Sequence, residues 1–433
     1  MAVISNDDIV HNALHGDPGL ADAQCQLLIA NKSSSPTPWI VSALIALRVG
    51  VPDKAMEWVD HARRYGGDVQ TLMDIEREIS RARISILRQP QPSRPRYHLI
   101  TCWGYGFWAD VEHVLGHLLL CEITGRFPII HWGANSWYSD DLHNDGFTRF
   151  FDPISPLGID DLPPHAGSIF PDKWVGQNLR RVIFNRYSGP GSRVPMISYL
   201  VRQELVTVAD FFAQVATLVR WLPQAHPMYG KSVEDVYAYL MARYIHPRPE
   251  ITDQVESFVG KHFSGRHVLG AHIRNNDKFQ ELGGHDPTQK INQLVKEYMD
   301  THPDSFLFLM TDNSHALAHY QERYGERLIF TNCLRSHNGK PVTWIATKPR
   351  EELGLEIMLD TYIGARCDAF IGLGLSSVVA AIGNLADPSR TKITLVGPKL
   401  QTFINVQPYI MEDPTRTSEK ADTQAPHELE PAE

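Results

Sequence analysis

Hydrophobic residues recur three and four positions apart over roughly residues 8 to 88, a spacing that places them on one face of successive α-helices. Runs of Ser, Pro and Gly interrupt this pattern at 33–38, 50–52 and 66–67, where one helix must end before the next begins. The pattern predicts an all-α domain of helical hairpins over residues 1–90. It is similar to a tetratricopeptide array, although no clean repeat of about 34 residues is present. Two roles are open for it, a cap on the next domain or a platform for a protein partner or for self-association.

A linker at 89–96 has three prolines in eight residues, which disfavours helix and marks a domain boundary. Beyond it the pattern changes to a β-rich run at 97–102, a turn of Gly and aromatic residues, a helix at 110–125 and a second strand at 128–132. Strand, glycine turn, helix and strand together form a βαβ unit. We therefore predict a first Rossmann-like lobe over 97–250, on the acceptor side. Two amphipathic helices are expected later in it, at 208–222 and 233–244.

A second alternation of strands and helices begins at Val268 and predicts another lobe over 251–411. Its strands are rich in Ile, Leu, Val and Phe without polar alternation, which indicates a parallel sheet covered on both faces. Two such lobes form a cleft, and ligands of these folds bind outside the carboxyl ends of the strands. The expected strands are 268–274, 306–311, 328–330, 369–372 and 392–396, with helices at 288–299, 314–324, 351–365 and 377–382.

Composition and charge narrow the class of protein. The 433 residues carry 41 basic and 50 acidic side chains, a formal charge of −9, which gives no global electrostatic case for wrapping nucleic acid. Residues 412–433 hold seven of the acids and two of the bases, so −5 of the total lies in what the composition predicts to be a disordered tail. The rest of the chain is close enough to balance for a few cations to hold an anionic ligand.

Cysteine usage and the chain's first residues bear on its compartment. Five widely spaced cysteines without a CxxC pair predict reduced thiols rather than a disulfide framework or a zinc site. The first residues carry acids where a secretory signal carries bases, and no apolar run approaches the length of about 20 residues that spans a bilayer. We therefore expect a cytoplasmic protein without a transmembrane segment.

Candidate chemistry gathers in loops that follow predicted strands. Arg274 leaves a buried strand two residues after His272, a position suited to bidentate contacts with phosphate, with a surface Arg–Asp pair as the alternative. Asp312 follows the next strand, where Asp and Ser also serve as helix caps. The segment 372–377, GLGLSS, combines glycines with a helix start, which attracts anions, although a helix cap explains its serines equally well.

Histidines 113 and 117 lie one helical turn apart after the Gly104-Tyr105-Gly106 turn. Such a pair can bind a metal ion. No carboxylate lies at a convincing spacing, so packing or hydrogen bonding near a lobe interface is the preferred interpretation. We predict no metal site.

Short motifs occur in a fixed order between residues 97 and 400. They are Cys102-Trp103-Gly104-Tyr105-Gly106, His113, Asn135-Ser136-Trp137-Tyr138, His272-x-Arg274-x-x-Asp277-Lys278, Thr311-Asp312, Asp360 and Ser376-Ser377. This ordered set resembles the α-1,6-fucosyltransferases, the family of the enzymes that add core fucose to N-glycans and of the NodZ enzymes that fucosylate Nod factors. The resemblance implies two lobes of GT-B-like architecture and an inverting, metal-independent glycosyltransferase without a cofactor. Its donor would be GDP-fucose and its acceptor a glycan or other glycoconjugate.

The resemblance also implies roles for single residues. Arg274 would bind the donor diphosphate, and Asp360 would recognise guanine with His272 nearby. The other donor-binding positions that it implies are Asp277, Asp312, Ser376, Ser377, Gly104, Tyr105, Gly106 and Tyr138. The family's base is a glutamate that follows the His-x-Arg loop, which maps onto Glu281, with Lys278 assisting through a relay. Deprotonation of an acceptor hydroxyl suits a carboxylate such as Glu281.

One departure from the family keeps alternatives open. Asn275 stands where family members carry a second arginine, which removes a cation opposite the departing diphosphate. Another nucleotide sugar is therefore an alternative donor, and a non-catalytic helical-repeat scaffold is a third hypothesis. The aromatic residues between 132 and 151 would either stack on acceptor sugars or form core, and the sequence does not name the acceptor.

Overall fold

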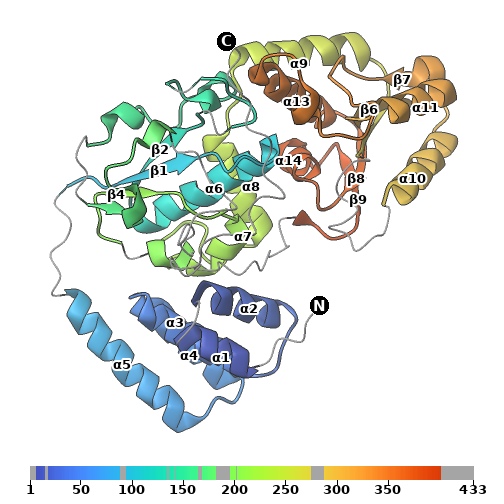
Figure 1. Cartoon of the computed structure of the whole chain (residues 1–433). Coiled ribbons are helices and arrows are strands. Elements are labelled where there is room, and N and C mark those ends of the chain that lie inside the picture. The colour runs from blue at the N-terminus through green and yellow to red at the C-terminus, as the bar shows by residue number, and fades with distance from the viewer. Residues whose placement is uncertain are drawn as a thin grey trace.

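The computed structural model describes residues 6–14, 18–87, 94–133, 136–141, 143–163, 168–181, 196–200, 202–274 and 287–400. An all-helical domain comes first, and two separate parallel β-sheets with surrounding helices follow it (Figure 1). The predicted class, α/β with two lobes behind a helical domain, is confirmed. Within the described residues no helix is both long and apolar enough to cross a membrane.

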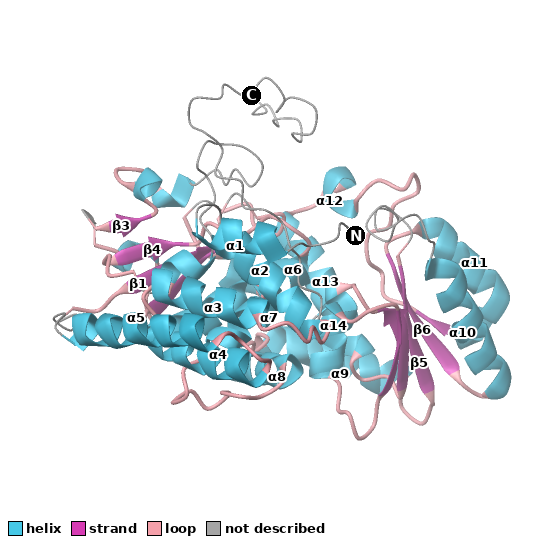
Figure 2. Cartoon of the chain, turned by 90° about the horizontal axis from the view of Figure 1, so that it is seen from below, coloured by secondary structure: helices cyan, strands magenta, loops and turns pink. Residues whose placement is uncertain are grey.

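Five helices make the N-terminal domain, and α3, α4 and α5 pack side by side (Figure 2). Prolines open α3 and α4 in their first turns, where a missing N–H costs nothing. Alanines 43, 46, 55 and 62 are fully buried, and such small side chains let the helices approach closely. The helices are α1 (Asn6–Leu14), α2 (Pro18–Ala30), α3 (Thr37–Arg48), α4 (Pro52–Arg64) and α5 (Val69–Leu87).

The helical domain is fixed to the first lobe through Arg220 and Trp221. Arg220 lies 3.3 Å from the buried carboxylate of Asp22, donates to Ser42 Oγ at 2.6 Å and stacks over the ring of Trp58. Trp221 meets Trp58 edge to face at 4.9 Å. Burial raises the pKa of Asp22, and the Arg220 guanidinium opposes that shift. These contacts favour the first of the two predicted roles, a cap on the following lobe.

The first lobe contains a four-stranded parallel sheet in the order β2-β1-β4-β3. Gly125, in the left-handed conformation, ends α6 and lets the chain turn into β2. The strands are β1 (Tyr97–Thr101), β2 (Phe127–His131), β3 (Ile169–Phe170) and β4 (Val206–Val208), and the helices are α6 (Phe107–Thr124), α7 (Val215–Leu218) and α8 (Val233–Tyr244). The next helix, α9 (Pro249–His262), packs on α13 and on the core of the second lobe.

One predicted element of this lobe is wrong. Instead of a single helix over 208–222, the chain forms β4, a loop, the single turn of α7 and a short 3-10 turn. The run is apolar almost throughout, so its periodicity does not separate a buried strand from a buried helix. Pairing of Val206–Val208 with β1 decides the outcome, and that contact spans more than 100 residues.

The second lobe contains a five-stranded parallel sheet in the order β7-β6-β5-β8-β9. Alternation of strands and helices follows the predicted series, and the short helix α12, between β7 and α13, is an element that was not predicted. The strands are β5 (Val268–Ile273), β6 (Phe306–Thr311), β7 (Leu328–Ile329), β8 (Ala369–Leu373) and β9 (Lys392–Val396), and the helices are α10 (Pro287–Thr301), α11 (Ser314–Tyr324), α12 (Val342–Ile345), α13 (Arg350–Gly364) and α14 (Ser377–Leu385).

Aromatic side chains of the first lobe pack against α13 and α14 of the second. Trp108 donates from Nε1 to Thr361 Oγ1 at 2.8 Å, and Phe150 lies so close to Gly354 that a Cβ there would stand 2.4 Å from the ring. The aromatic residues between 132 and 151 that become buried here are Trp132, Tyr138, Phe147, Phe150 and Phe151. These residues form core and do not stack on acceptor sugars. Of the Trp, Tyr and Phe residues between 132 and 151, only Trp137 is partly exposed.

Candidate functional site

The topology of the second sheet places its switch point between β5 and β8, the position at which such folds form a crevice, here called the β5–β8 crevice. From β5 the sheet continues through β6 to β7 on one side, and from β8 it continues to β9 on the other side. The segments that follow β5 and β8 therefore leave the sheet toward opposite faces. β5 and β8 are paired in register, with Ala271 beside Ile371, and adjacent strands are about 4.8 Å apart. Arg274 follows β5 and Gly374 follows β8, so these two positions meet at the same edge of the sheet. This is where ligands bind in such folds.

The turn after β8 is built for close backbone approach. The Gly374 N–H donates to Val396 O at 2.9 Å, and a Cβ on Gly374 would lie 2.2 Å from Pro398 O. Ser376 is buried and caps α14 by accepting from Val379 N at 3.4 Å. Its hydroxyl is thus used as a helix cap, and the N–H groups of a helix's first turn, which lack intrahelical partners, favour an anion.

His272 lies on β5 beside this crevice. Burial, together with the neighbouring Arg274 guanidinium, lowers the pKa of His272 to about 3, so its ring is neutral at physiological pH. Its buried Nδ1 has no hydrogen-bond partner among the described residues. A buried polar atom without a partner costs free energy, and a bound ligand would satisfy it.

The loop after β6 serves a structural purpose first. Asn313 caps α11 by accepting from His315 N and Ala316 N at 2.9 and 3.0 Å, so the cap is Asn313 and neither Asp312 nor Ser314, which the sequence favoured. The Asp312 carbonyl accepts from Ser336 N at 2.7 Å. This bond ties the segment after β7 to the end of β6.

That segment packs against Asp360 of α13, whose side chain is only 8% exposed, and surrounds it with polar groups. Thr331 donates its hydroxyl to the Asp360 carboxylate, and Arg335 donates to the carbonyls of Thr331 and Cys333 at 2.8 and 3.0 Å. Burial raises the pKa of Asp360 to about 6, against the opposing effects of the Thr331 hydroxyl and the Arg335 guanidinium. A carboxylate with a guanidinium nearby suits a base that presents both N–H donors and acceptors.

Sequence reasoning missed Thr331 and Arg335. A usable signal existed for Thr331, because it follows a predicted strand as directly as Asp312 follows its own, whereas Arg335 stands five residues beyond that strand. Glu356, one turn before Asp360 on α13, was missed as well, and its Oε2 accepts from Leu334 N at 3.0 Å. No local motif marks this contact.

In the first lobe, side chains hold the Gly104-Tyr105-Gly106 turn in place. The fully buried carboxylate of Asp110 accepts from Gly104 N and Tyr105 N at 3.1 and 3.0 Å, and Gly104 has a φ of 75°. The Tyr138 hydroxyl accepts from Phe107 N at 2.9 Å, and burial raises its pKa. Tyr138 is thus engaged with the start of α6, while Gly106 forms the N-cap of that helix.

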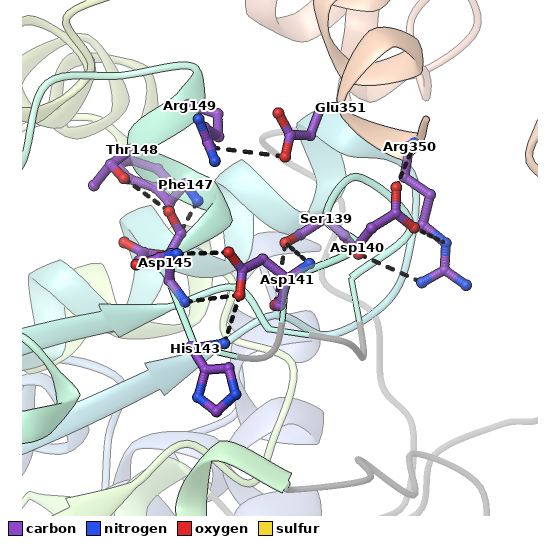
Figure 3. Close-up of polar contacts among 11 residues, drawn as sticks. Ser139, Asp140, Asp141, His143, Asp145, Phe147, Thr148, Arg149, Arg350 and Glu351 are labelled. Atoms are coloured by element: carbon purple, nitrogen blue, oxygen red, sulfur yellow. Dashed lines mark hydrogen bonds and ion pairs between the residues drawn. The ribbon is translucent and has the colours of Figure 1, made fainter. Parts of the chain in front are cut away.

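The start of α13 joins the second lobe to the first (Figure 3). Arg350 donates from its backbone N–H to Asp140 Oδ2 at 2.9 Å and from Nη1 to Ser136 O at 3.1 Å. One residue further, Glu351 lies 3.7 Å from Arg149. The helix that carries Asp360 is therefore fixed to residues 136–149, next to the Gly104 turn, which Trp137 Nε1 contacts at 3.0 Å.

The predicted histidine pair belongs to a buried hydrogen-bonded chain. His98 bridges Thr207 Oγ1 and His117 Nδ1 at 2.7 and 2.8 Å, and His117 Nε2 reaches Phe211 O. His113 lies between Thr101 O and Ala213 N. Burial lowers the pKa of all three rings, that of His117 to about 3. Both nitrogens of each ring have protein partners. His113 and His117 therefore form hydrogen bonds, which is the interpretation that the sequence favoured over metal binding. No cluster suited to a metal ion occurs in the part of the chain that the structure describes.

Three predicted site residues, Asp277, Lys278 and Glu281, lie outside the described residues, as does Asn275. The structure brings together Arg274, His272, Ser376 and Ser377 around the β5–β8 crevice. Asp312 and Asp360 both contact the segment that follows β7. In the sheet, β6 and β7 lie on the side of β5 that is away from β8. Gly104, Tyr105, Gly106 and Tyr138 belong to the first lobe, across the contact that Arg350 makes.

Comparison with known proteins gives matches of structure alone, because no protein-family model and no curated protein match the sequence. The chain is similar to NodZ α-1,6-fucosyltransferase co-crystallised with GDP, with 18% identity, 68% of this chain and 93% of the other covered, and a TM-score of 0.45. Fucosyltransferase NodZ from Bradyrhizobium is 18% identical, with 68% of this chain and 94% of the other covered and a TM-score of 0.46. POFUT1 in complex with GDP-fucose is 13% identical, with 72% of this chain and 100% of the other covered and a TM-score of 0.43. The first two of these structures are named as fucosyltransferases.

Proposed function

We propose that the protein is an inverting glycosyltransferase that transfers L-fucose from GDP-fucose to a hydroxyl of a glycan or oligosaccharide, as α-1,6-fucosyltransferases do. The observation that carries this proposal is the switch point of the sheet between β5 and β8, where Arg274 and the glycine-rich start of α14 follow adjacent strands at the same edge. The motif resemblance supplies the donor's identity, and the polar groups around Asp360 have the chemistry for its base.

The donor diphosphate would lie against Arg274 and the first turn of α14. A guanidinium binds phosphate oxygens in a bidentate manner, and the free N–H groups of a helix start add a favourable dipole. Ser377 opens that helix and Ser376 caps it, which fits a close approach of phosphate. The neutral ring of His272 offers its unpartnered Nδ1 to the same ligand.

Guanine would lie against Asp360 and Arg335. The Asp360 carboxylate accepts from guanine N–H groups, and Arg335 is suited to the O6 and N7 acceptors of the same base. Uracil presents a single N–H donor, at N3, where guanine presents two side by side, so the Asp360 carboxylate makes one hydrogen bond fewer to uracil. These residues therefore favour GDP over UDP sugars.

The reaction is a direct displacement at the anomeric carbon. Glu281 would take the proton of the acceptor hydroxyl while the acceptor oxygen bonds to the sugar and GDP departs with the electrons of the broken bond. Charge on the departing diphosphate would be stabilised by Arg274, by Lys278 and by the start of α14. Because cationic side chains perform this task, we propose catalysis independent of divalent metal. Asp277, Lys278 and Glu281 rest on the sequence alone.

A transfer assay tests this function. Full-length protein incubated with GDP-fucose and a panel of oligosaccharide acceptors should release GDP and form a fucosylated product, in the presence of EDTA as well as without it. UDP- and dTDP-sugars in parallel reactions test the alternative donor that Asn275 leaves open. Turnover of another nucleotide sugar in preference to GDP-fucose would overturn the proposed donor, and a strict need for added metal would overturn the proposed mechanism.

Asp360→Asn is expected to weaken GDP binding about tenfold, because an amide accepts only one of the two guanine N–H groups. The effect has a pH signature. With a pKa of about 6, Asp360 is ionised at pH 7.5 and largely protonated at pH 5, so wild-type affinity should fall over that range. Protonation of the GDP phosphates acts equally on both proteins, so the ratio of wild-type to variant affinity isolates Asp360. Calorimetry should show this ratio shrinking toward one at pH 5, and a constant ratio would contradict the role.

A further inference from the structure

A cavity of about 250 Å³ lies on the outer side of β2, the edge strand of the first sheet. Its walls come from the end of β2, from the turn at 143–148 and from the loop at 153–160. Sites for drug-sized ligands have volumes of about 300–1,000 Å³, so this cavity is small by comparison. It has room for one compact group such as a single sugar ring, and not for a nucleotide.

The cavity contains strand backbone that has no neighbour. In a parallel strand at the edge of a sheet, every second residue turns its N–H and C=O away from the adjacent strand. On β2, Trp132 is such a residue, and the turn satisfies it: its N–H donates to Asp145 Oδ1 at 2.8 Å and its carbonyl accepts from Gly146 N at 2.9 Å. Ile130, two residues earlier, has the same outward orientation and lines the cavity. Within the described residues, no group forms a hydrogen bond with its N–H or its C=O.

The unpaired backbone of Ile130 points to a bound ligand. Ile130 is only 9% exposed, and buried backbone groups are almost always paired. The N–H and C=O of one strand residue point the same way, so a ligand that satisfies both needs an acceptor and a donor side by side. Neighbouring hydroxyls of a sugar ring meet this requirement, because each hydroxyl both donates and accepts.

Charges around the cavity favour a neutral ligand. The carboxylates of Asp145 and Asp160 line it and disfavour an anion. Asp160 pairs with Arg180, and this contact, followed by the nearby rings of His131 and His143, lowers the pKa of Asp160. The acids are thus balanced by basic groups on the same side, so the cavity offers no excess charge that would select a cation either.

The remaining wall is aliphatic, with Ile154, Leu157 and Ile159 beside Ile130. At about 30 Å³ for each molecule, water would fill the cavity with roughly eight molecules. Those next to the aliphatic wall would find no hydrogen-bond partner there, so their release on binding is favourable. The C–H face of a sugar ring can cover such a wall while its hydroxyls reach the backbone.

We propose that this cavity binds one neutral sugar residue, with a pair of neighbouring hydroxyls on the N–H and C=O of Ile130. On the basis of the proposed function, this sugar belongs to the acceptor glycan and is not the one that receives fucose, because the cavity lies on the side of β2 away from β1 and its Gly104 turn. The turn that forms one wall continues to Arg149, which lies 3.7 Å from Glu351 of α13 (Figure 3). The acceptor is thus held at a second point, beside the junction of the lobes.

Saturation-transfer NMR on the full-length protein without nucleotide tests this site. The probes are methyl α-glucoside, methyl α-galactoside and methyl α-mannoside. At least one of them should bind saturably with a Kd on the order of 1 mM, as expected for a ligand of about a dozen heavy atoms. Tetrahydropyran-2-methanol keeps the ring but has no pair of neighbouring hydroxyls, so it should not bind. No saturable binding of the three glycosides up to about 50 mM, or equal binding of the control compound, would overturn the proposal.

Ser155→Phe locates the binding, because it places an aromatic ring in the cavity that Ser155 lines. It should weaken glycoside binding more than about tenfold. Ser389→Phe is the matched control: this serine is exposed on the second lobe and, like Ser155, makes a local turn bond, here to Asp387 Oδ1 at 2.7 Å. The control should bind glycosides as the wild type does, and both variants should keep wild-type affinity for GDP.

His143→Trp fills the cavity from its exposed side and provides a second test should Ser155→Phe fail to fold. The hydrogen bonds of His143 with Asp141 and Arg180 use its backbone, so the melting temperature should change little. Unchanged glycoside affinity in these cavity variants would contradict the site. The titrations contain no donor. A wild type that transfers fucose but binds no glycoside therefore contradicts the cavity alone, and glycoside binding without any transfer contradicts the proposed function alone.

Discussion

Replacing Arg274 with alanine is expected to abolish fucose transfer and to weaken GDP binding at least about 100-fold, the cost of losing a charge-assisted bidentate contact. Arg274 stands at the end of β5, across from the start of α14, so no other described side chain follows that strand into the crevice. Asn275, where the family has a second arginine, increases the dependence on Arg274. Calorimetric titration with GDP measures the loss directly.

Two further variants give this result its meaning. Arg266→Ala removes an arginine at the opposite, amino end of β5, where the side chain donates to His262 O and stacks over Phe306, and it should leave GDP affinity unchanged. Arg274→Lys keeps the charge but loses the planar fork, so an intermediate loss of about tenfold is expected. GDP affinity unaffected by Arg274→Ala would remove this residue from the donor site.

Gly374→Ala is expected to destabilise the protein by about 2–3 kcal/mol and to lower GDP affinity sharply, although the change adds only one methyl group. The new Cβ would lie 2.2 Å from Pro398 O and 3.0 Å from Gly397 O, and these are backbone atoms that cannot rotate away. The turn after β8 must therefore shift, together with the start of α14 that we propose binds phosphate. Chemical denaturation and calorimetry report the two effects separately.

Gly383→Ala supplies the matched control for this prediction. Gly383 lies in α14, only nine residues further, and a Cβ there would meet its nearest neighbour at an ordinary 3.8 Å. Alanine in a helix is more favourable than glycine by roughly 0.5–1 kcal/mol, so this variant should be slightly more stable than the wild type and bind GDP normally. If both glycine variants behaved alike, close packing at Gly374 would not be the cause.

Elements with strong local patterns were predictable from the sequence. β6 and α11 have the predicted bounds, and all five strands of the second sheet occur where the apolar runs predict them. α6 begins at Phe107, three residues earlier than expected, because Gly106 provides the N-cap directly after the turn. Helices and buried strands of this kind are specified by residues close together in the sequence.

Elements that depend on distant contacts were not predictable. β3 and β4 have two and three residues, too few for any periodicity, and they exist because they pair with each other and with β1. The same holds for parts of the site. Asp110 was read only as the start of a helix, yet its carboxylate holds the Gly104 turn. The contact of Arg350 with Asp140 joins residues 210 positions apart, which no local motif announces.

The central claim is that the crevice between β5 and β8 binds GDP through protein groups alone. Isothermal titration of the full-length protein with GDP, UDP and dTDP, each in EDTA, tests it most directly. We predict one GDP site per chain with a Kd on the order of micromolar, and binding of UDP and dTDP at least about tenfold weaker. Absence of GDP binding, or equal affinity for UDP, would contradict the account.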